Sequence, residues 1–500
     1  MEDIRSENME KGNDNLAIGA KGGAIAFGLK IGNTALGFLN QILLARLLGA
    51  GGVGEVILAV TVVRIFAQIA KFGMEETMMK FIPLYSDQND ESRLKGTISF
   101  SIKFCLLVSV VFMFLILISS KFIAINIFHS EGLLKLIPVI VVAIPAWVIR
   151  DVIGGILKGH KDALRALIPE SIISPFFKIA ILLLLTLKGI SPFYATIAFV
   201  GGEVLAVIVS IKFLLNKVAA LKTVKAQCEN KKILEVAYTI IFTSMSVLLY
   251  TQADIWILGM FTSTEVVGVY GIAAKLVLLV YFPMVAFGAV IPSLIASIYS
   301  SGDLQEMRRV VRESTRWILS IAMPIILILV LEGKYILNYC YGSEFEAGYV
   351  VLVILTIGQM IKAGSGMVGI LFQMTGEHKV YMKINIVWGI LNIILNIILV
   401  PRYGMIGAAI ATAFCLSMVD IISIFVIHRR LSVLTLAKGL SFDFLFIAVV
   451  SVLYVVLIQS NFFILQHILL FVALTVYLLK YIYSNDIPWQ LLSGKLLNKR

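Results

Sequence analysis

Apolar segments of about 20 residues recur along the whole chain, with short polar segments between them. A helix of about 20 residues crosses the roughly 30 Å hydrocarbon core of a bilayer. The pattern predicts an all-α membrane protein with about fourteen transmembrane helices. The expected spans are residues 22–44, 56–73, 98–119, 136–156, 168–187, 192–215, 236–259, 267–298, 317–331, 348–372, 384–400, 404–427, 442–458 and 467–483.

Polar residues follow one helical face in each of the first two spans. Lys30 and Asn33 share a face of the first span, and Arg64, Gln68 and Lys71 share a face of the second. A lone cation at the centre of a membrane helix costs roughly 2.5–3.5 kcal/mol or more, so such residues usually face a bundle interior or a wet cavity. We interpret the two stripes as one wall of a cationic cavity. The alternative is that both cations are held in internal ion pairs.

Prolines interrupt several spans, most clearly the eighth, which contains Pro283 and Pro292. Breaks of this kind persist where protein or a cavity satisfies the freed backbone groups. They often flank the binding sites of transporters. We therefore expect the eighth span to be a broken helix.

The composition excludes a soluble enzyme. Hydrophobic residues make up 59% of the 500 residues and charged residues 14%, with a mean hydropathy of +0.96. Soluble domains carry about 25% charged residues. The longest expected segment outside the membrane is residues 74–97. This leaves no room for a catalytic domain, so we expect no enzyme activity and a function located among the helices.

Two local patterns mimic binding motifs without their context. Gly49, Gly51 and Gly54 match the GxGxxG spacing, but no strand precedes them and no βαβ unit follows, so they indicate a tight turn. The four cysteines are scattered and form no CxxC pair, which indicates neither a metal site nor a disulfide framework. We expect no cofactor, no metal and no catalytic residues.

The positive charge of the chain is a topology signal. The even-numbered connections and the two tails hold 26 Lys and Arg residues, whereas the odd-numbered connections hold 6. Because cytoplasmic loops carry the excess of Lys and Arg, both termini are expected in the cytoplasm, with the chain in the cytoplasmic (inner) membrane. The net charge of +12 therefore needs no nucleic-acid partner, and contact with anionic membrane lipid is expected instead.

Short motifs recur in register in the two halves of the chain, which predicts two parallel six-helix repeats related by an axis along the membrane normal. The expected organisation is a tail 1–21, a lobe 22–215, a basic linker 216–235, a lobe 236–427, a terminal hairpin 442–483 and a tail 484–500. The recurring motifs are Leu48-Gly49 with Gly54 and Leu258-Gly259 with Gly268, Ile82-Pro83 and Ile291-Pro292, and Gly155-Ile156-Leu157 and Gly369-Ile370-Leu371.

Cations outnumber acids inside the spans, and this excess suits an anionic ligand such as phosphate or pyrophosphate. Arginine offers a bidentate fork to such a ligand, and lysine a point charge. Lys71 lies near a cytoplasmic end and is expected to snorkel. Arg150 and Asp151 are neighbours in sequence and are expected not to face each other on one helix. The candidate substrate-binding residues are Lys30, Arg64, Lys275, Asn33, Gln68, Asp254, Arg150 and Lys362.

The turn Ala45-Arg46-Leu47-Leu48-Gly49 with Gly54, its repeat Leu258-Gly259 with Gly268, and the loop Gly159-His160-Lys161 resemble a known family. They resemble the polysaccharide-biosynthesis branch of the multidrug/oligosaccharidyl-lipid/polysaccharide (MOP) superfamily, and most of all its Wzx-type oligosaccharide and O-antigen flippases. The resemblance covers essentially the whole chain.

The resemblance implies a V-shaped, two-lobe exporter that works by alternating access. It also implies a lipid-linked oligosaccharide on a polyprenyl diphosphate carrier as cargo, moved from the cytoplasmic to the outer leaflet. Lipid II flippases of this superfamily place essential cations on spans one, two and eight, which are the spans of Lys30, Arg64 and Lys275. The hairpin 442–483 resembles the extra helices that form a lipid-tail groove. A coupling cation and glycan-assembly proteins stay open as further partners.

The main alternative is a MATE-like drug or cation antiporter, which shares the two-lobe fold. Such antiporters usually have twelve spans and favour acidic residues for cationic drugs, so the span number and the cationic interior argue against this alternative. A membrane glycosyltransferase or polymerase is a weaker alternative, because no large outer loop carries candidate acids.

The charge asymmetry predicts that Cys228, in the basic linker, lies on the cytoplasmic side. A membrane-impermeant thiol reagent should label Cys228 only after the cells are permeabilised. Labelling of Cys228 in intact cells would contradict the predicted orientation.

Overall fold

The computed structural model describes residues 2–227, 229–288 and 291–431, together with short pieces beyond, mainly 449–454 and 472–477. Every regular element in this part of the chain is helical. The α-helices are α1 (Glu2–Lys71), α2 (Met74–Asp87), α3 (Glu91–Ile118), α4 (Glu131–Ile140), α5 (Ala143–Gly159), α6 (Ala163–Ile168), α7 (Ser174–Thr186), α8 (Pro192–Lys217), α9 (Asn230–Phe261), α10 (Thr264–Phe287), α11 (Ile291–Ser301), α12 (Leu304–Leu331), α13 (Gly333–Ile336), α14 (Tyr349–Ser365), α15 (Val368–Met374) and α16 (His378–Leu431). Short π- and 3-10-helical segments lie between them, at η1 (Phe122–Ile127), η2 (Pro169–Ile173), η3 (Ala219–Thr223), η4 (Leu337–Tyr341) and η5 (Ser343–Gly348).

Within the described ranges, eight helical segments are long and apolar enough to cross a membrane, and the pair α4–α5, bent by 45°, makes a ninth. Two of them, Phe27–Asp87, which contains most of α1, and α16, have 61 and 54 residues and are much longer than one span of about 20 residues. Each breaks at a glycine with positive φ, Gly49 (φ 67°) in α1 and Gly404 (φ 54°) in α16, a conformation that glycine adopts without steric cost. Together with α9, these helices cover the first twelve predicted spans, which confirms the all-α membrane fold.

The proline-containing eighth span is broken, as expected. Helix α10 ends at Phe287 and α11 begins at Ile291, directly before Pro292. The tenth span breaks as well, because Gly366, with φ 68°, ends α14 before α15 begins. The predicted tail 1–21 is helical from Glu2 onward and continues into the first span.

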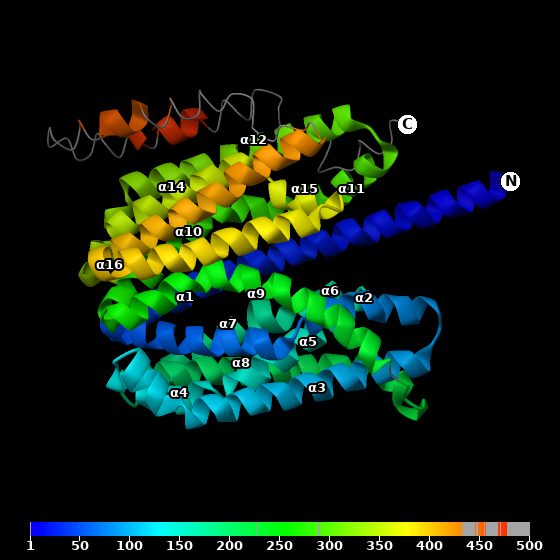
Figure 1. The fold of residues 1–500 in the computed structure, drawn as a ribbon, viewed down its shortest axis with the longest axis horizontal. Coiled ribbons are helices and arrows are strands. Elements are labelled where there is room, and N and C mark those ends of the chain that lie inside the picture. The colour runs from blue at the N-terminus through cyan, green and yellow to red at the C-terminus, as the bar shows by residue number, and fades with distance from the viewer. Residues whose placement is uncertain are drawn as a thin grey trace.

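The helices form two groups in space (Figure 1). Helices α2–α8 lie together on one side, α10, α12, α14, α15 and α16 lie on the other, and α1 and α9 run between the groups. One hydrophobic cluster fills the first group and reaches along α9 and α10 to η4, η5 and α14. A second cluster fills the interior of the other group. The exact lobe boundaries, 22–215 and 236–427, and their relation by a rotation about the membrane normal stay predictions.

The two copies of the repeated glycine turn face each other across the two groups. A Cβ added to Gly54 would overlap the Thr264 carbonyl oxygen, and one added to Gly268 would overlap the Ala50 carbonyl oxygen. The contact is reciprocal, because Ala50 precedes Gly54 by the same four residues by which Thr264 precedes Gly268. Glycine thus lets α1 and α10 approach backbone to backbone at this end.

Polar contacts reinforce the same end of the molecule. The backbone N–H of Ala50 donates to Glu344 Oε2 at 2.8 Å, and Arg46 Nε donates to the Cys340 carbonyl at 3.0 Å. Arg46 also donates to the Tyr339 carbonyl. The charge pattern assigns these connections to the outer side of the membrane. The glycine contact and these hydrogen bonds therefore close the end predicted to face outward.

Most of the predicted terminal hairpin, the tail 484–500 and Cys228 lie outside the described residues. The described pieces of the hairpin pack on α12. Val450, Tyr454, Leu470 and Ala473 form a cluster with Leu327. Tyr454 Oη also donates to Glu332 Oε1 at 2.7 Å, next to the end of α12.

The close approach of α1 and α10 predicts that Gly268→Ala abolishes complementation of a deletion strain, because the added Cβ has no space at the contact. The protein should still be inserted in the membrane. Gly28→Ala is the matched control, since nothing lies within 4 Å of a Cβ at Gly28. Complementation by Gly268→Ala at wild-type level would show that the outer end does not need this contact.

Candidate functional site

Arg64 and Lys275 are the accessible deep cations of the bundle interior. Arg64 lies on the second part of α1 and Lys275 on α10, and both side chains are exposed. Their charges lie close enough to interact, and Lys178 of α7 is close to both. Among the described residues, neither cation has a carboxylate within the 4.0 Å of an ion pair. The two therefore share an interior region with no acidic partner of their own.

Lys30 belongs to the first part of α1, which also packs against α10. One turn before it, Phe27 packs on Phe282 of α10, with 5.8 Å between the ring centroids. Lys30 is exposed and likewise has no carboxylate within 4.0 Å in the described ranges. The structure thus brings the first part of α1, which carries Lys30, and the second part, which carries Arg64, against the helix of Lys275.

Arg150 has a different environment from these three cations. It lies on α5, is only 6% exposed, and is ion-paired with Glu203 of α8 and with Asp151. The expectation that Arg150 and Asp151 do not face each other is wrong, because Arg150 Nε and Nη2 donate to Asp151 Oδ1 at 3.1 and 2.8 Å. The helical spacing rule describes short side chains, whereas the long arginine side chain folds back to its neighbour.

Lys71 also differs from its expected role. It is 8% exposed and does not snorkel to the surface. Its Nζ lies 2.8 Å from Glu75 Oε2 and 3.6 Å from Asp151 Oδ2. Glu75 in turn pairs with Lys158 at 2.8 Å. Lys71 is therefore part of an internal ion-pair chain.

Sequence reasoning missed Trp147 as part of this region. The guanidinium carbon of Arg64 lies 5.4 Å from the Trp147 ring centroid, and that of Arg150 lies 5.7 Å from it. Cation–π contacts favour a guanidinium over an indole within about 6 Å. Trp147 therefore contacts both the accessible Arg64 and the buried Arg150. Its position three residues before Arg150 was the available signal in the sequence.

The other predicted residues divide between the two helix groups. Asn33 and Gln68 are half-buried on the two parts of α1. Asp254 of α9 is buried and accepts hydrogen bonds from Tyr270 Oη at 2.5 Å and Thr412 Oγ1 at 3.3 Å. Lys362 of α14 lies 5.3 Å from the Tyr281 ring centroid. Asp254 and Lys362 thus belong to contacts among α9, α10, α14 and α16, apart from the Trp147 region.

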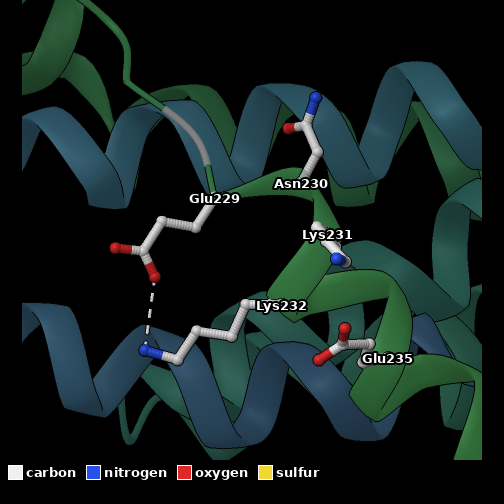
Figure 2. Close-up of a pocket in the computed structure, with 5 residues that line it drawn as sticks. All are labelled: Glu229, Asn230, Lys231, Lys232 and Glu235. Atoms are coloured by element: carbon white, nitrogen blue, oxygen red, sulfur yellow. Dashed lines mark ion pairs between the residues drawn. The ribbon is translucent and has the colours of Figure 1, made fainter.

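A surface pocket lies at the start of α9, where the linker enters the second group of helices (Figure 2). Its volume is about 510 Å³, and its lining residues are Glu229, Asn230, Lys231, Lys232 and Glu235. Glu229 pairs with Lys232 at 3.2 Å and with Arg93 at 3.4 Å, and the hydrogen bond from Lys232 lowers the pKa of Glu229. The pocket is thus a polar surface feature of the linker, tied to the start of α3 through Arg93.

Within the described parts of the chain, no group of three or more His, Cys, Asp or Glu residues is placed to hold a metal ion.

The charged groups around Arg64 are Glu203, Arg150, Asp151 and Glu170. The arrangement is suited to bind an anion at Arg64 and Lys275, with paired charges behind them.

Comparison with known proteins places the chain in a family. The model of the family described as "Polysaccharide biosynthesis protein" matches residues 20–298, and the MatE model matches residues 239–398. The chain is thus a multi-pass membrane protein. It belongs to the polysaccharide biosynthesis protein family.

Three similar proteins illustrate this relationship. A probable low-salt glycan biosynthesis flippase of Haloferax volcanii is 25% identical over 33% of this chain and 35% of its own length. A probable flippase of the same organism is 27% identical over 39% of this chain and 41% of its own length. A putative O-antigen transporter of Shigella flexneri is 23% identical over 75% of this chain and 88% of its own length. The chain thus spans about two fifths or less of the two archaeal relatives.

Solved structures share the fold. The lipid II flippase MurJ in an inward closed conformation superposes with a TM-score of 0.71 at 19% identity, over 92% of this chain and 99% of that chain. An inward-facing MATE family multidrug transporter superposes with a TM-score of 0.68 at 14% identity, over 82% of this chain and 98% of that chain. The all-helical membrane fold, which this chain shares with these structures, is thereby confirmed.

The ion pairing predicts a contrast between two arginines. Arg150→Met leaves Glu203 and Asp151 with one cation fewer in the interior, and breaking a buried pair costs about 3–5 kcal/mol. The purified variant should therefore unfold at a clearly lower temperature than the wild type. Arg64→Met, the matched control, should unfold near the wild-type temperature, because Arg64 has no carboxylate within ion-pair distance among the described residues. Equal unfolding temperatures for both variants would contradict the assignment of Arg150 to a structural ion pair.

Proposed function

We propose that the protein is a flippase that moves a polyprenyl-diphosphate-linked oligosaccharide from the cytoplasmic to the outer leaflet of the cytoplasmic membrane. The observation that carries the proposal is the set of accessible cations Lys30, Arg64 and Lys275, with no acidic partner among the described residues. Cations inside a membrane bundle are costly without a counter-charge. A diphosphate supplies that counter-charge, with the fork of Arg64 and the point charges of the lysines as its ligands.

The polar residues around these cations suit the rest of such a headgroup. Asn33 and Gln68, on the two parts of α1, offer amide groups to sugar hydroxyls, and Arg150 supports the site from behind Trp147. An oligosaccharide is costly to pull through hydrocarbon, since each unsatisfied polar group there costs several kcal/mol. A cavity between two lobes shields the headgroup while the polyprenyl tail stays in lipid, along the hairpin 442–483.

Alternating access fits the contacts at the outer end. Hydrogen bonds such as Ala50 to Glu344 and the glycine contact of α1 with α10 bury no charge pair, so they separate at modest cost. The lobes 22–215 and 236–427 then rock around the central cations, with both termini in the cytoplasm. Asp254 and Lys362, in the second group of helices, respond to this motion. A coupling cation and glycan-assembly proteins are the expected partners besides membrane lipid.

The proposed oligosaccharide cargo agrees with the names of the similar proteins. Two of them are named as probable flippases and one as a putative O-antigen transporter. The second candidate is a MATE-like drug or cation antiporter, which the MatE match over residues 239–398 favours. Cationic drugs need acidic ligands, whereas Arg64, Lys275 and the neighbouring Lys178 are cations, and neither Arg64 nor Lys275 has a carboxylate within ion-pair distance among the described residues. This difference favours the flippase over the antiporter.

Depletion of the protein is the direct test of the function. Lipid-linked oligosaccharide should then accumulate in the cytoplasmic leaflet, surface glycan should be lost, and glycan synthesis should continue. The measurement is the accessibility of the lipid-linked glycan to an impermeant lectin or glycosidase in spheroplasts. Unchanged surface glycan together with new sensitivity to cationic dyes would favour the antiporter.

Substitution of the accessible cations tests the site. Arg64→Ala should abolish complementation, while Arg64→Lys should keep part of it, because the charge survives and the bidentate fork does not. Lys275→Ala should behave like Arg64→Ala. Membrane abundance is the control in each case. Full complementation by both alanine variants at normal abundance would reject a diphosphate site at these residues.

A further inference from the structure

One buried carboxylate, Glu203 of α8, holds two of the deep cations. Its side chain is 2% exposed and accepts hydrogen bonds from Arg150 Nη1, from Lys178 Nζ at 2.6 Å and from Ser174 Oγ at 2.9 Å. Four lone-pair sites are available on a carboxylate, so these three donors occupy most of its capacity. Arg150 and Lys178 come from α5 and α7, and Glu203 therefore joins three helices of the first group.

The two cations held by Glu203 lie directly behind the accessible site. An aromatic pair, Trp147 and Phe199, lies next to both sets of charges, with 5.9 Å between the ring centroids. The Trp147 ring contacts both Arg64 and Arg150, and the Phe199 centroid lies 3.9 Å from Lys178 Nζ. Lys178 also lies within electrostatic range of Lys275 and Arg64. Without a counter-charge, Lys178 is therefore close enough to act on an anion bound there.

We infer that Glu203 is a positioning residue that keeps Lys178 and Arg150 out of the substrate site, and so sets how strongly the site holds a diphosphate. This inference rests on the proposed function. With Glu203 ionised, the diphosphate is held by Lys30, Arg64 and Lys275 alone. A carrier must release its cargo on the far side. Without the Glu203 charge, Lys178 loses its carboxylate and Arg150 keeps only Asp151, so one added net positive charge strengthens binding in every state and slows that release. Glu203 also fixes Arg150 behind Trp147, which orients the ring on which Arg64 lies.

The test measures binding of inorganic pyrophosphate to the purified full-length protein, together with complementation. Glu203→Gln keeps the shape and removes the charge, so pyrophosphate should bind about tenfold tighter, as expected for one added net charge near the site. Complementation should fall at the same time, because release is slower. Unchanged affinity in a folded Glu203→Gln protein would overturn the inference.

A charge-compensated variant separates this role from a merely structural one. Glu203→Gln combined with Lys178→Gln removes one anion and one cation, so affinity and complementation should return toward wild type. Loss of a purely structural hydrogen bond would not be rescued by removing Lys178. Ser174→Ala is the matched control, since it removes a neutral donor to Glu203 and should leave the affinity within about twofold.

A further comparison keeps the inference testable when Glu203→Gln does not fold. Lys178→Gln alone should weaken pyrophosphate binding clearly less than Lys275→Gln, which should weaken it about tenfold, because Lys275 contacts the ligand whereas Lys178 is paired with Glu203 and acts on the ligand only from a distance. An equal loss in both variants would make Lys178 a site cation and overturn the inference. Should neither Lys275→Gln nor Arg64→Ala change binding, the proposed function itself fails. Loss in these two variants without any effect of Glu203 rejects only the inference.

Discussion

The cost of taking charge out of water is the constraint on which the rest of this structure depends. An isolated ion in a low-dielectric interior is penalised by several kcal/mol even after relaxation, so buried charges must be paired. The first group of helices meets this need with a chain of alternating charges in which each carboxylate lies between two cations. The order of the chain is Lys158, Glu75, Lys71, Asp151, Arg150, Glu203 and Lys178.

This chain of ion pairs joins α1, α2, α5, α7 and α8 into one unit. It also distinguishes the structural cations from the accessible ones. The paired charges are buried or half-buried, whereas Arg64 and Lys275 are exposed. Trp147 contacts the accessible Arg64, and Phe199 contacts Lys178 of the ion-pair chain. Such a site combines a rigid chain of ion pairs with a few accessible cations that can bind a ligand. This division favours an anionic cargo over a cationic one.

The outer end of the molecule follows a different principle. There the two helix groups meet through backbone contacts at Gly54 and Gly268, where the absence of a side chain permits close approach. A hydrogen bond such as the one from the Ala50 N–H to the Glu344 carboxylate contributes about 1.5–3 kcal/mol. These contacts close the outer end of the molecule but can separate without breaking an ion pair. A strong ion-pair chain within one group and weak contacts between the groups together favour rigid-body motion of the groups over deformation within them.

The sequence by itself determined the helices and the polar stripes of α1, because span length and helical spacing are local properties of the chain. It also located the glycine turns and the break at Pro292, since these depend on the backbone freedom of single residues. Only the tertiary structure decided which cations are paired. Arg150 and Lys178 are 53 and 25 residues from Glu203 in sequence, and no local pattern reports that α5, α7 and α8 bring them together. Arginine therefore forms a structural ion pair at position 150 and an accessible cation at position 64. Both lie next to Trp147, but the packing of neighbouring helices placed a carboxylate within ion-pair distance of Arg150 only, among the described residues.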